Sequence, residues 1–277
     1  MRLEGICRGL VWTLLAVLAV SCSDFNKIRK SDDWQKKYNA ALEYYEEEDY
    51  YRANILLEEV LPLLRGTEYE EKAQFYYAYS HYYREQYILS AHYFKTFFDT
   101  YGRSQYAEEA LYKYAYSLYL QSPETNLDQS STYEAISAIQ LFINRYPGSE
   151  YREEATEIID KMQRKLEVKA FENARLYHQL RVWKSAIIAF ENFSDDFPDS
   201  PLNERASYLK IDAAYELAVR SVESKKEERY RQAVDYYQEF LDEYPASEYL
   251  RDAESVYKAT LRGLESVNKS TETADNS

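Results

Sequence analysis

The segment Tyr146-Pro-Gly-Ser-Glu-Tyr151 decides the fold, because variants of it recur along the chain. The other copies are Tyr101-Gly-Arg-Ser-Gln-Tyr106, Phe197-Pro-Asp-Ser-Pro-Leu202, Tyr244-Pro-Ala-Ser-Glu-Tyr249 and the degenerate Leu64-Arg-Gly-Thr-Glu-Tyr69. In each copy Gly or Pro can end one helix, and Ser or Thr can cap the free N–H groups of the next. The recurring segment therefore predicts a series of helices joined by similar turns.

The residues before each turn follow one helical pattern. Apolar or aromatic side chains recur at offsets 0, 3, 4, 7, 8 and 11, and only Ser90 and Ser194 depart from this pattern in the five copies. This spacing places one apolar stripe on a helix of 3.6 residues per turn. The first copy consists of Ala53, Leu56, Leu57, Val60, Leu61 and Leu64.

A second helix precedes each of these stripes and carries a small residue where helices can cross closely. These crossing alanines are Ala41, Ala78, Ala115, Ala174 and Ala214. The pattern resembles the tetratricopeptide repeat, whose helix pairs span about 34 residues. It predicts an all-α fold, a right-handed solenoid of five tetratricopeptide-like helix pairs.

The repeats divide the chain into segments. We expect N-terminal repeats 1–3 over residues 34–148 and C-terminal repeats 4–5 over residues 149–264. The extra residues between Tyr146 and Ala174 predict one long linking helix from about Glu150 to Leu180. Residues 265–277 are polar and poor in apolar side chains, and we expect a disordered tail there.

Composition excludes several classes of function. The 277 residues include 48 Asp and Glu against 34 Lys and Arg, a formal charge of −14, which argues against nucleic-acid binding. Two cysteines are too few for a disulfide framework or a four-thiolate zinc site. No zinc-protease, serine-hydrolase or phosphate-loop motif occurs, and His81 sits at a core-type helix position. We therefore expect a non-enzymatic protein without a cofactor or metal.

The N-terminus has the pattern of an export signal. Residues 1–21 combine a basic start with the apolar stretch Leu10–Val20, which is too short to span a membrane. The following Ala19-Val20-Ser21-Cys22 resembles a bacterial lipobox. This predicts lipidation of Cys22, a membrane lipid anchor and a polar tether over residues 22–33; the alternative is ordinary cleavage beside an incidental cysteine.

The 31 tyrosines suggest a binding surface. In a helix-pair solenoid the first helix of each pair lines the concave face. Positions one and four after the crossing alanine should point into that groove. In repeats 1–3 they give the peptide-groove candidates Leu42, Tyr45, Tyr79, Tyr82, Tyr116 and Tyr119. Tyrosine offers a large contact area and a hydroxyl for a peptide backbone, although the same rings could merely fill space between repeats.

Together, the export signal, lipobox, tether, turn motifs and long helix resemble the BamD family of outer-membrane assembly lipoproteins. The resemblance implies anchoring on the periplasmic face of the outer membrane and association with a BamA-like barrel subunit. It also implies recognition of C-terminal segments of unfolded outer-membrane proteins by the N-terminal repeats. A glycan-binding nutrient-uptake lipoprotein and a helical-repeat adaptor of envelope machinery remain alternatives.

Overall fold

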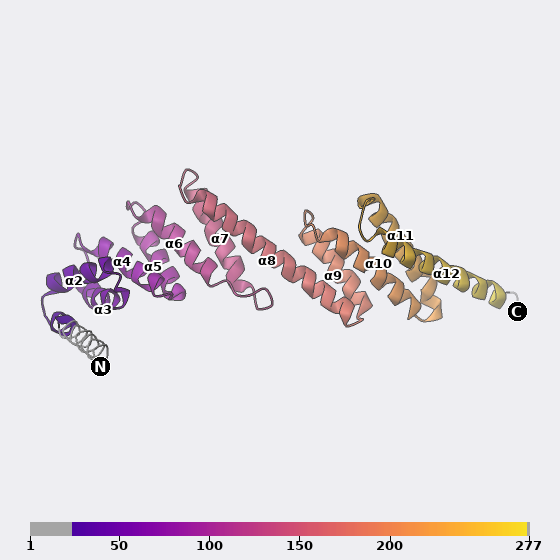
Figure 1. Cartoon of the computed structure of the whole chain (residues 1–277), viewed down its shortest axis with the longest axis horizontal. Helices are drawn as coiled ribbons and strands as arrows, with labels where there is room; N and C mark the ends of the chain where they lie inside the picture. The colour runs from indigo at the N-terminus through magenta and orange to yellow at the C-terminus, as the bar shows by residue number, and fades with distance from the viewer. Residues whose placement is uncertain (1–23, 276–277) are drawn as a thin grey trace, which may run out of the picture. The chain divides into compact units, whose positions relative to one another are not determined.

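The computed structural model describes residues 24–275, and within that range the chain forms helices and no strand (Figure 1). The chain divides into two compact units, the first ending at Met162 and the second beginning at Gln163. No helix in the described part is both long and apolar enough to cross a membrane. The predicted signal segment 1–21 and Cys22 lie outside the described residues.

Successive helices pack against one another within each unit, as in a helical-repeat solenoid. The first unit contains α2 (Trp34–Glu46), α3 (Tyr50–Val60), the short 3₁₀ helix η1 (Leu61–Leu63), α4 (Glu70–Tyr83), α5 (Tyr87–Thr100), α6 (Ala107–Leu120), α7 (Ser130–Arg145) and the start of α8 (Arg152–Gln179). The second contains the rest of α8, then α9 (Trp183–Asp196), α10 (Asn203–Val219), α11 (Glu223–Glu243) and α12 (Leu250–Asp275). The all-helical repeat fold predicted from the sequence is confirmed.

The crossing alanines lie where the pattern predicts. All five side chains are at most 2% exposed. Each belongs to the first helix of a pair, and in every repeat the alanine shares a core cluster with the apolar stripe of the following helix. A larger side chain at these positions would separate the two backbones, because protein interiors are close-packed.

The Ser or Thr of each recurring turn segment contacts the backbone just before the next helix, whereas the N-cap residues of α4, α6 and α10 form no side-chain cap hydrogen bond. The hydroxyl oxygens of Ser104, Ser149, Ser200 and Ser247 each accept a hydrogen bond from the backbone N–H two residues later, at 2.9–3.1 Å. Thr67 makes the same contact to the N–H of Tyr69 at 3.4 Å. One side-chain oxygen therefore satisfies an N–H group at the start of five helices.

Three of the five hairpins share a second kind of turn. Glu48, Glu85 and Arg181 each lie seven residues after a crossing alanine and have positive φ angles of 62°, 58° and 60°. The following N–H donates to the carbonyl five residues back, at 2.8, 2.9 and 3.0 Å, which is the hydrogen bond of a Schellman motif. These are the three repeats in which the alanine and the next stripe are 12 residues apart. The equal 12-residue spacing in these three repeats therefore reflects the turn geometry that they share.

The folded part begins earlier than the predicted start at Trp34. Residues 24–29 are helical, and Phe25 is 8% exposed in the core of the first repeat. Its ring lies edge-on to Tyr44 at 5.8 Å, with the guanidinium of Arg52 5.6 Å from the ring centroid. Ile28 packs against the same core, so burial of these two apolar side chains fixes the segment.

Two further boundaries differ from the sequence analysis. The two units divide inside α8 rather than at residue 148. Helix α12 continues past Leu264, through the first part of the segment 265–277 predicted to be disordered. Leu264 and Val267 pack with Ala218 and Tyr230, so apolar contact extends the helix beyond the last repeat.

Candidate functional site

The six predicted groove residues all lie in the first unit, on α2, α4 and α6. Four of them form an unbroken series of aromatic contacts. The ring centroids of Tyr79 and Tyr82 are 6.1 Å apart, those of Tyr82 and Tyr116 are 6.3 Å apart, and those of Tyr116 and Tyr119 are 5.7 Å apart. The contact between Tyr82 and Tyr116 joins two successive repeats.

Tyr45 joins this series through a residue that the sequence analysis missed. The ring of Tyr83 is stacked with Tyr79 at 5.6 Å and lies 6.2 Å from Tyr45. Leu42 instead packs against the hydrophobic core of the first repeat. We therefore define the tyrosine ladder as Tyr45, Tyr83, Tyr79, Tyr82, Tyr116 and Tyr119.

The members of the ladder differ in what they can offer a ligand. Tyr79 is only 5% exposed, packs edge-on against Phe94, and donates its hydroxyl hydrogen bond to Glu109. Its ring therefore packs in the core, which agrees with the alternative that these tyrosines fill space between repeats. Tyr83 is 47% exposed, and Tyr45, Tyr82, Tyr116 and Tyr119 are half-buried. These five rings leave part of their surface available to a partner.

The hydroxyl groups of Tyr82 and Tyr116 remain protonated at neutral pH. Burial raises the pKa of Tyr82 to about 12, with a smaller contribution from the neighbouring Tyr116. Burial likewise raises the pKa of Tyr116 above its ordinary value. Both hydroxyls can therefore donate hydrogen bonds to carbonyl or carboxylate oxygens.

A lysine occupies the centre of the ladder, and the sequence analysis missed it. The Nζ atom of Lys113 lies 4.9 Å from the ring centroid of Tyr82, 5.5 Å from Tyr116, 5.6 Å from Tyr112 and 5.9 Å from Tyr79. Such distances are those of cation–π contacts. Burial lowers the pKa of Lys113, and the carboxylates of Glu109 and Glu154 oppose that shift.

A simple spacing rule could have located Lys113. Lys113 lies two residues before the crossing alanine of its own repeat. In the folded chain this position contacts the residue that lies four after the crossing alanine of the preceding repeat. The rule relates Tyr45 to Tyr76, with ring centroids 4.5 Å apart, and Tyr82 to Lys113. It holds in the second unit for His178 and Asp212, whose Nε2 and Oδ2 atoms are 2.7 Å apart.

The equivalent surface of the second unit has a different chemistry. At its groove positions Arg175 forms an ion pair with Glu172, and His178 contacts Asp212. The second unit thus has an ion pair and a histidine–carboxylate contact at positions where repeats 1–3 carry tyrosines, while Tyr215 keeps a ring contact with Tyr230 at 6.4 Å. The tyrosine ladder is a property of the first three repeats.

His81 has the packing role expected of it. It is 4% exposed, and its two ring nitrogens lie 3.1 Å from Asn54 Nδ2 and 2.7 Å from Gln86 Oε1. With Asn54 donating to Nε2, the proton belongs on Nδ1, which donates to Gln86. Both nitrogens are therefore occupied within the core.

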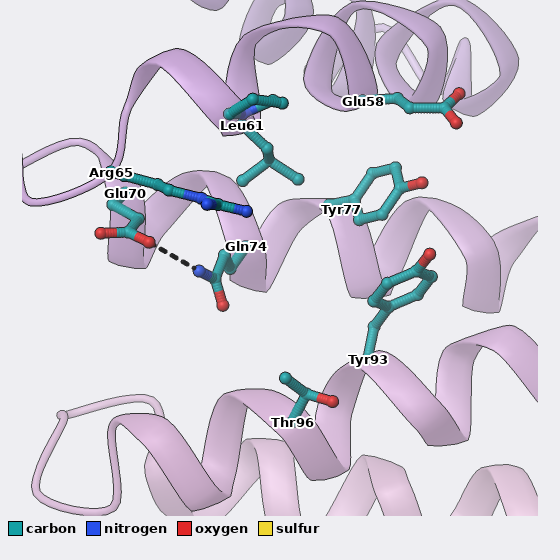
Figure 2. Close-up of a pocket in the computed structure, with 9 residues that line it drawn as sticks. Glu58, Leu61, Arg65, Glu70, Gln74, Tyr77, Tyr93 and Thr96 are labelled. Carbon is teal, nitrogen blue, oxygen red and sulfur yellow. Dashed lines mark hydrogen bonds between the residues drawn. The ribbon is translucent and has the colours of Figure 1, made fainter.

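A separate hollow of about 330 Å³ lies between η1, α4 and α5. Figure 2 shows Arg65 and Gln74 on one side of it and the rings of Tyr77 and Tyr93 on the other. Gln74 Nε2 donates to Glu70 Oε1 at 3.1 Å. The volume is at the lower end of ligand pockets, and its lining includes no paired nucleophile and base.

The family comparison covers both units. A family model, YfiO, described as outer membrane lipoprotein, matches residues 30–206 and 181–264. No curated protein matches the chain.

Proposed function

Because the chain belongs to the YfiO family of outer membrane lipoproteins, the family of BamD, we propose that it is a non-enzymatic subunit of the β-barrel assembly machinery. A lipid on Cys22 anchors it to the periplasmic face of the outer membrane. The family match and the lipobox support this role. Phe25, packed in the first repeat only three residues after Cys22, keeps the anchor close to the folded protein, because three residues span about 10 Å at most.

The first unit binds segments of unfolded outer-membrane proteins in this proposal. Its tyrosine ladder is the observation that carries it, since the partly exposed rings of Tyr45, Tyr83, Tyr82 and Tyr116 contact one another in series from α2 through α4 to α6. Such rings provide contact area with little loss of side-chain freedom. The protonated hydroxyls of Tyr82 and Tyr116 can donate to the backbone carbonyls of an extended chain.

The second unit scaffolds a BamA-like barrel subunit in this proposal. At the end of α8 and the start of α9, Leu176, Leu180 and Val182 are 50%, 62% and 46% exposed. Neighbouring exposed apolar side chains are typical of protein–protein contact sites. The Arg175–Glu172 ion pair and the His178–Asp212 contact at its groove positions make this unit a poorer surface for an aromatic peptide than the first.

Purification through a C-terminal tag tests the proposed role. The tagged protein, extracted from membranes with mild detergent, should recover a BamA-like barrel subunit in stoichiometric amount. Recovery of a glycan transporter instead would favour a nutrient-uptake lipoprotein. A parallel purification of the triple variant Leu176→Ser, Leu180→Ser, Val182→Ser should lose the barrel subunit while the protein stays folded by circular dichroism.

A further inference from the structure

The charge of Lys113 has no ion-pair partner. Among the side chains that the structure describes, no carboxylate lies within 4.0 Å of its Nζ atom, whereas Lys37 and Lys95 in the same unit reach Glu59 and Asp99 at 2.8 and 2.6 Å. We propose that Lys113 binds the C-terminal carboxylate of a peptide seated on the tyrosine ladder. This inference rests on the proposed function, and it names the chemistry that the ladder selects.

The two nearby carboxylates leave this role open. Glu109 accepts the hydroxyl hydrogen bond of Tyr79, and Glu154 influences Lys113 only at longer range. The ammonium group is half-buried and faces tyrosine rings. It has therefore lost part of its hydration, and the aromatic faces that replace the water bind a cation more weakly. A carboxylate placed there forms a charge-assisted hydrogen bond in surroundings from which water is partly excluded.

The geometry favours a chain terminus over an internal Asp or Glu. A C-terminal aromatic residue carries its ring and its carboxylate on one Cα, and Lys113 Nζ lies 4.9 Å from one ladder ring and 5.5 Å from another. One residue can therefore place its carboxylate on Lys113 and its ring on Tyr82 or Tyr116. In an extended segment the residues next to an internal Asp or Glu point to the opposite face, so their rings point away from the acidic side chain.

The same surroundings limit the site to one carboxylate. The carboxylates of Glu109 and Glu154 both lie near enough to Lys113 to influence its pKa. A peptide with a second acidic group beside its terminus would meet these two charges without a second cation to offset them. The site thus prefers an aromatic, weakly charged segment.

Fluorescence anisotropy of labelled peptides tests the inference on the full mature protein in detergent. The probe is a ten-residue peptide of alternating aromatic and polar residues ending in Phe, prepared as the free acid and as the C-terminal amide. We expect the native protein to bind the acid about tenfold more tightly than the amide. Lys113→Met should abolish that preference, so that the variant binds the acid and the amide with equal affinity.

Two further variants separate charge from structure. Lys113→Arg keeps the cation and should keep the preference for the acid. Lys95→Met removes a positive charge that is already paired on α5 and should change nothing. A preference for the acid that survives Lys113→Met overturns the inference, as does equal binding of acid and amide by the native protein.

Two other outcomes are equally decisive. If a C-terminal amide with an internal Asp binds as tightly as the free acid and depends on Lys113, the carboxylate comes from a side chain, and the assignment to a chain terminus is wrong. If the native protein binds neither peptide, the proposed peptide recognition fails and the inference fails with it. Binding of both peptides without dependence on Lys113 leaves peptide recognition standing and removes this inference alone.

Discussion

The Nζ atom of Lys113 lies 4.9 Å from the ring centroid of Tyr82, and this contact joins α6 to α4 at the centre of the tyrosine ladder. The same two repeat positions bring His178 to Asp212 in the second unit. The helix-pair geometry therefore fixes which positions meet, and the residue types at those positions set the chemistry. At these positions the first unit pairs Tyr45 with Tyr76 and Tyr82 with Lys113, whereas the second unit pairs His178 with Asp212.

Replacing Glu85 by glycine should stabilise the protein. Glu85 has a φ of 58° at the end of α4, a conformation that disfavours any residue with a Cβ. We expect Glu85→Gly to raise the free energy of unfolding by about 0.5–1 kcal/mol, after allowing for the greater freedom of glycine in the unfolded chain. Urea denaturation measures the change. Glu85→Ala is the control, and an equal gain from alanine would contradict the explanation.

Gly263 permits the close packing of α12 on α11. A Cβ at this position would lie 2.4 Å from Cζ of Tyr230 and 2.7 Å from its hydroxyl. Gly263→Ala should therefore lower the stability of the second unit by about 1–3 kcal/mol. Gly148→Ala is the matched control, since no atom lies within 4 Å of a Cβ there. Thermal unfolding that is identical for the two variants would show that α12 does not pack on Tyr230 in this way.

Phe25 distinguishes a folded N-terminal segment from a free tether. Its burial in the first repeat predicts that Phe25→Ala lowers the free energy of unfolding by about 3 kcal/mol. Lys27→Ala, two residues later on an exposed position, should have no measurable effect. Equal stability of the two variants in chemical denaturation would mean that this segment contributes nothing to the fold.

Glu59 should make the first repeat sensitive to acid. Burial opposes its charged form, but hydrogen bonds from Lys37 and Arg29 at 2.8 Å outweigh that effect and hold the pKa of Glu59 below its usual value. Because the pKa is lowered on folding, the stabilisation is present above the unfolded value of about 4.3 and is lost as the pH falls through the folded value. Glu59→Gln should therefore be less stable than the native protein at pH 7.

Urea unfolding at two pH values checks this prediction. The difference in stability between the native protein and Glu59→Gln should shrink from pH 7 to pH 3. Glu58→Gln, one residue earlier and outside the ion pairs of the described part of the chain, is the control. A difference that stays constant with pH would show that the Glu59 contacts are not electrostatic.

Much of this architecture follows from sequence spacing. The crossing alanines and the turn serines predict both the helix pairs and their caps, because these positions depend on local geometry that repeats. The ends of the fold could not be predicted in this way. Phe25 and Val267 lie outside the repeat, and their burial depends on tertiary contacts with Tyr44 and Tyr230.

The candidate site was predicted in part. Two offsets from each crossing alanine located Tyr79, Tyr82, Tyr116 and Tyr119, which contact one another in series. The same offsets missed Lys113, because they considered one helix at a time. The position that faces a neighbouring repeat becomes evident only when two helices are placed side by side.

The central claim is that the tyrosine ladder binds an extended aromatic peptide, and one affinity measurement tests it most directly. The double variant Tyr82→Ala, Tyr119→Ala removes two half-buried ladder rings, while Tyr51→Ala, Tyr133→Ala removes two rings that are 60% exposed and outside the ladder. The peptide is the C-terminal segment of an outer-membrane protein. The ladder variant should bind it at least about tenfold more weakly than the native protein does. The control variant should bind it with the native affinity. Equal affinities of both variants and the native protein would contradict the claim.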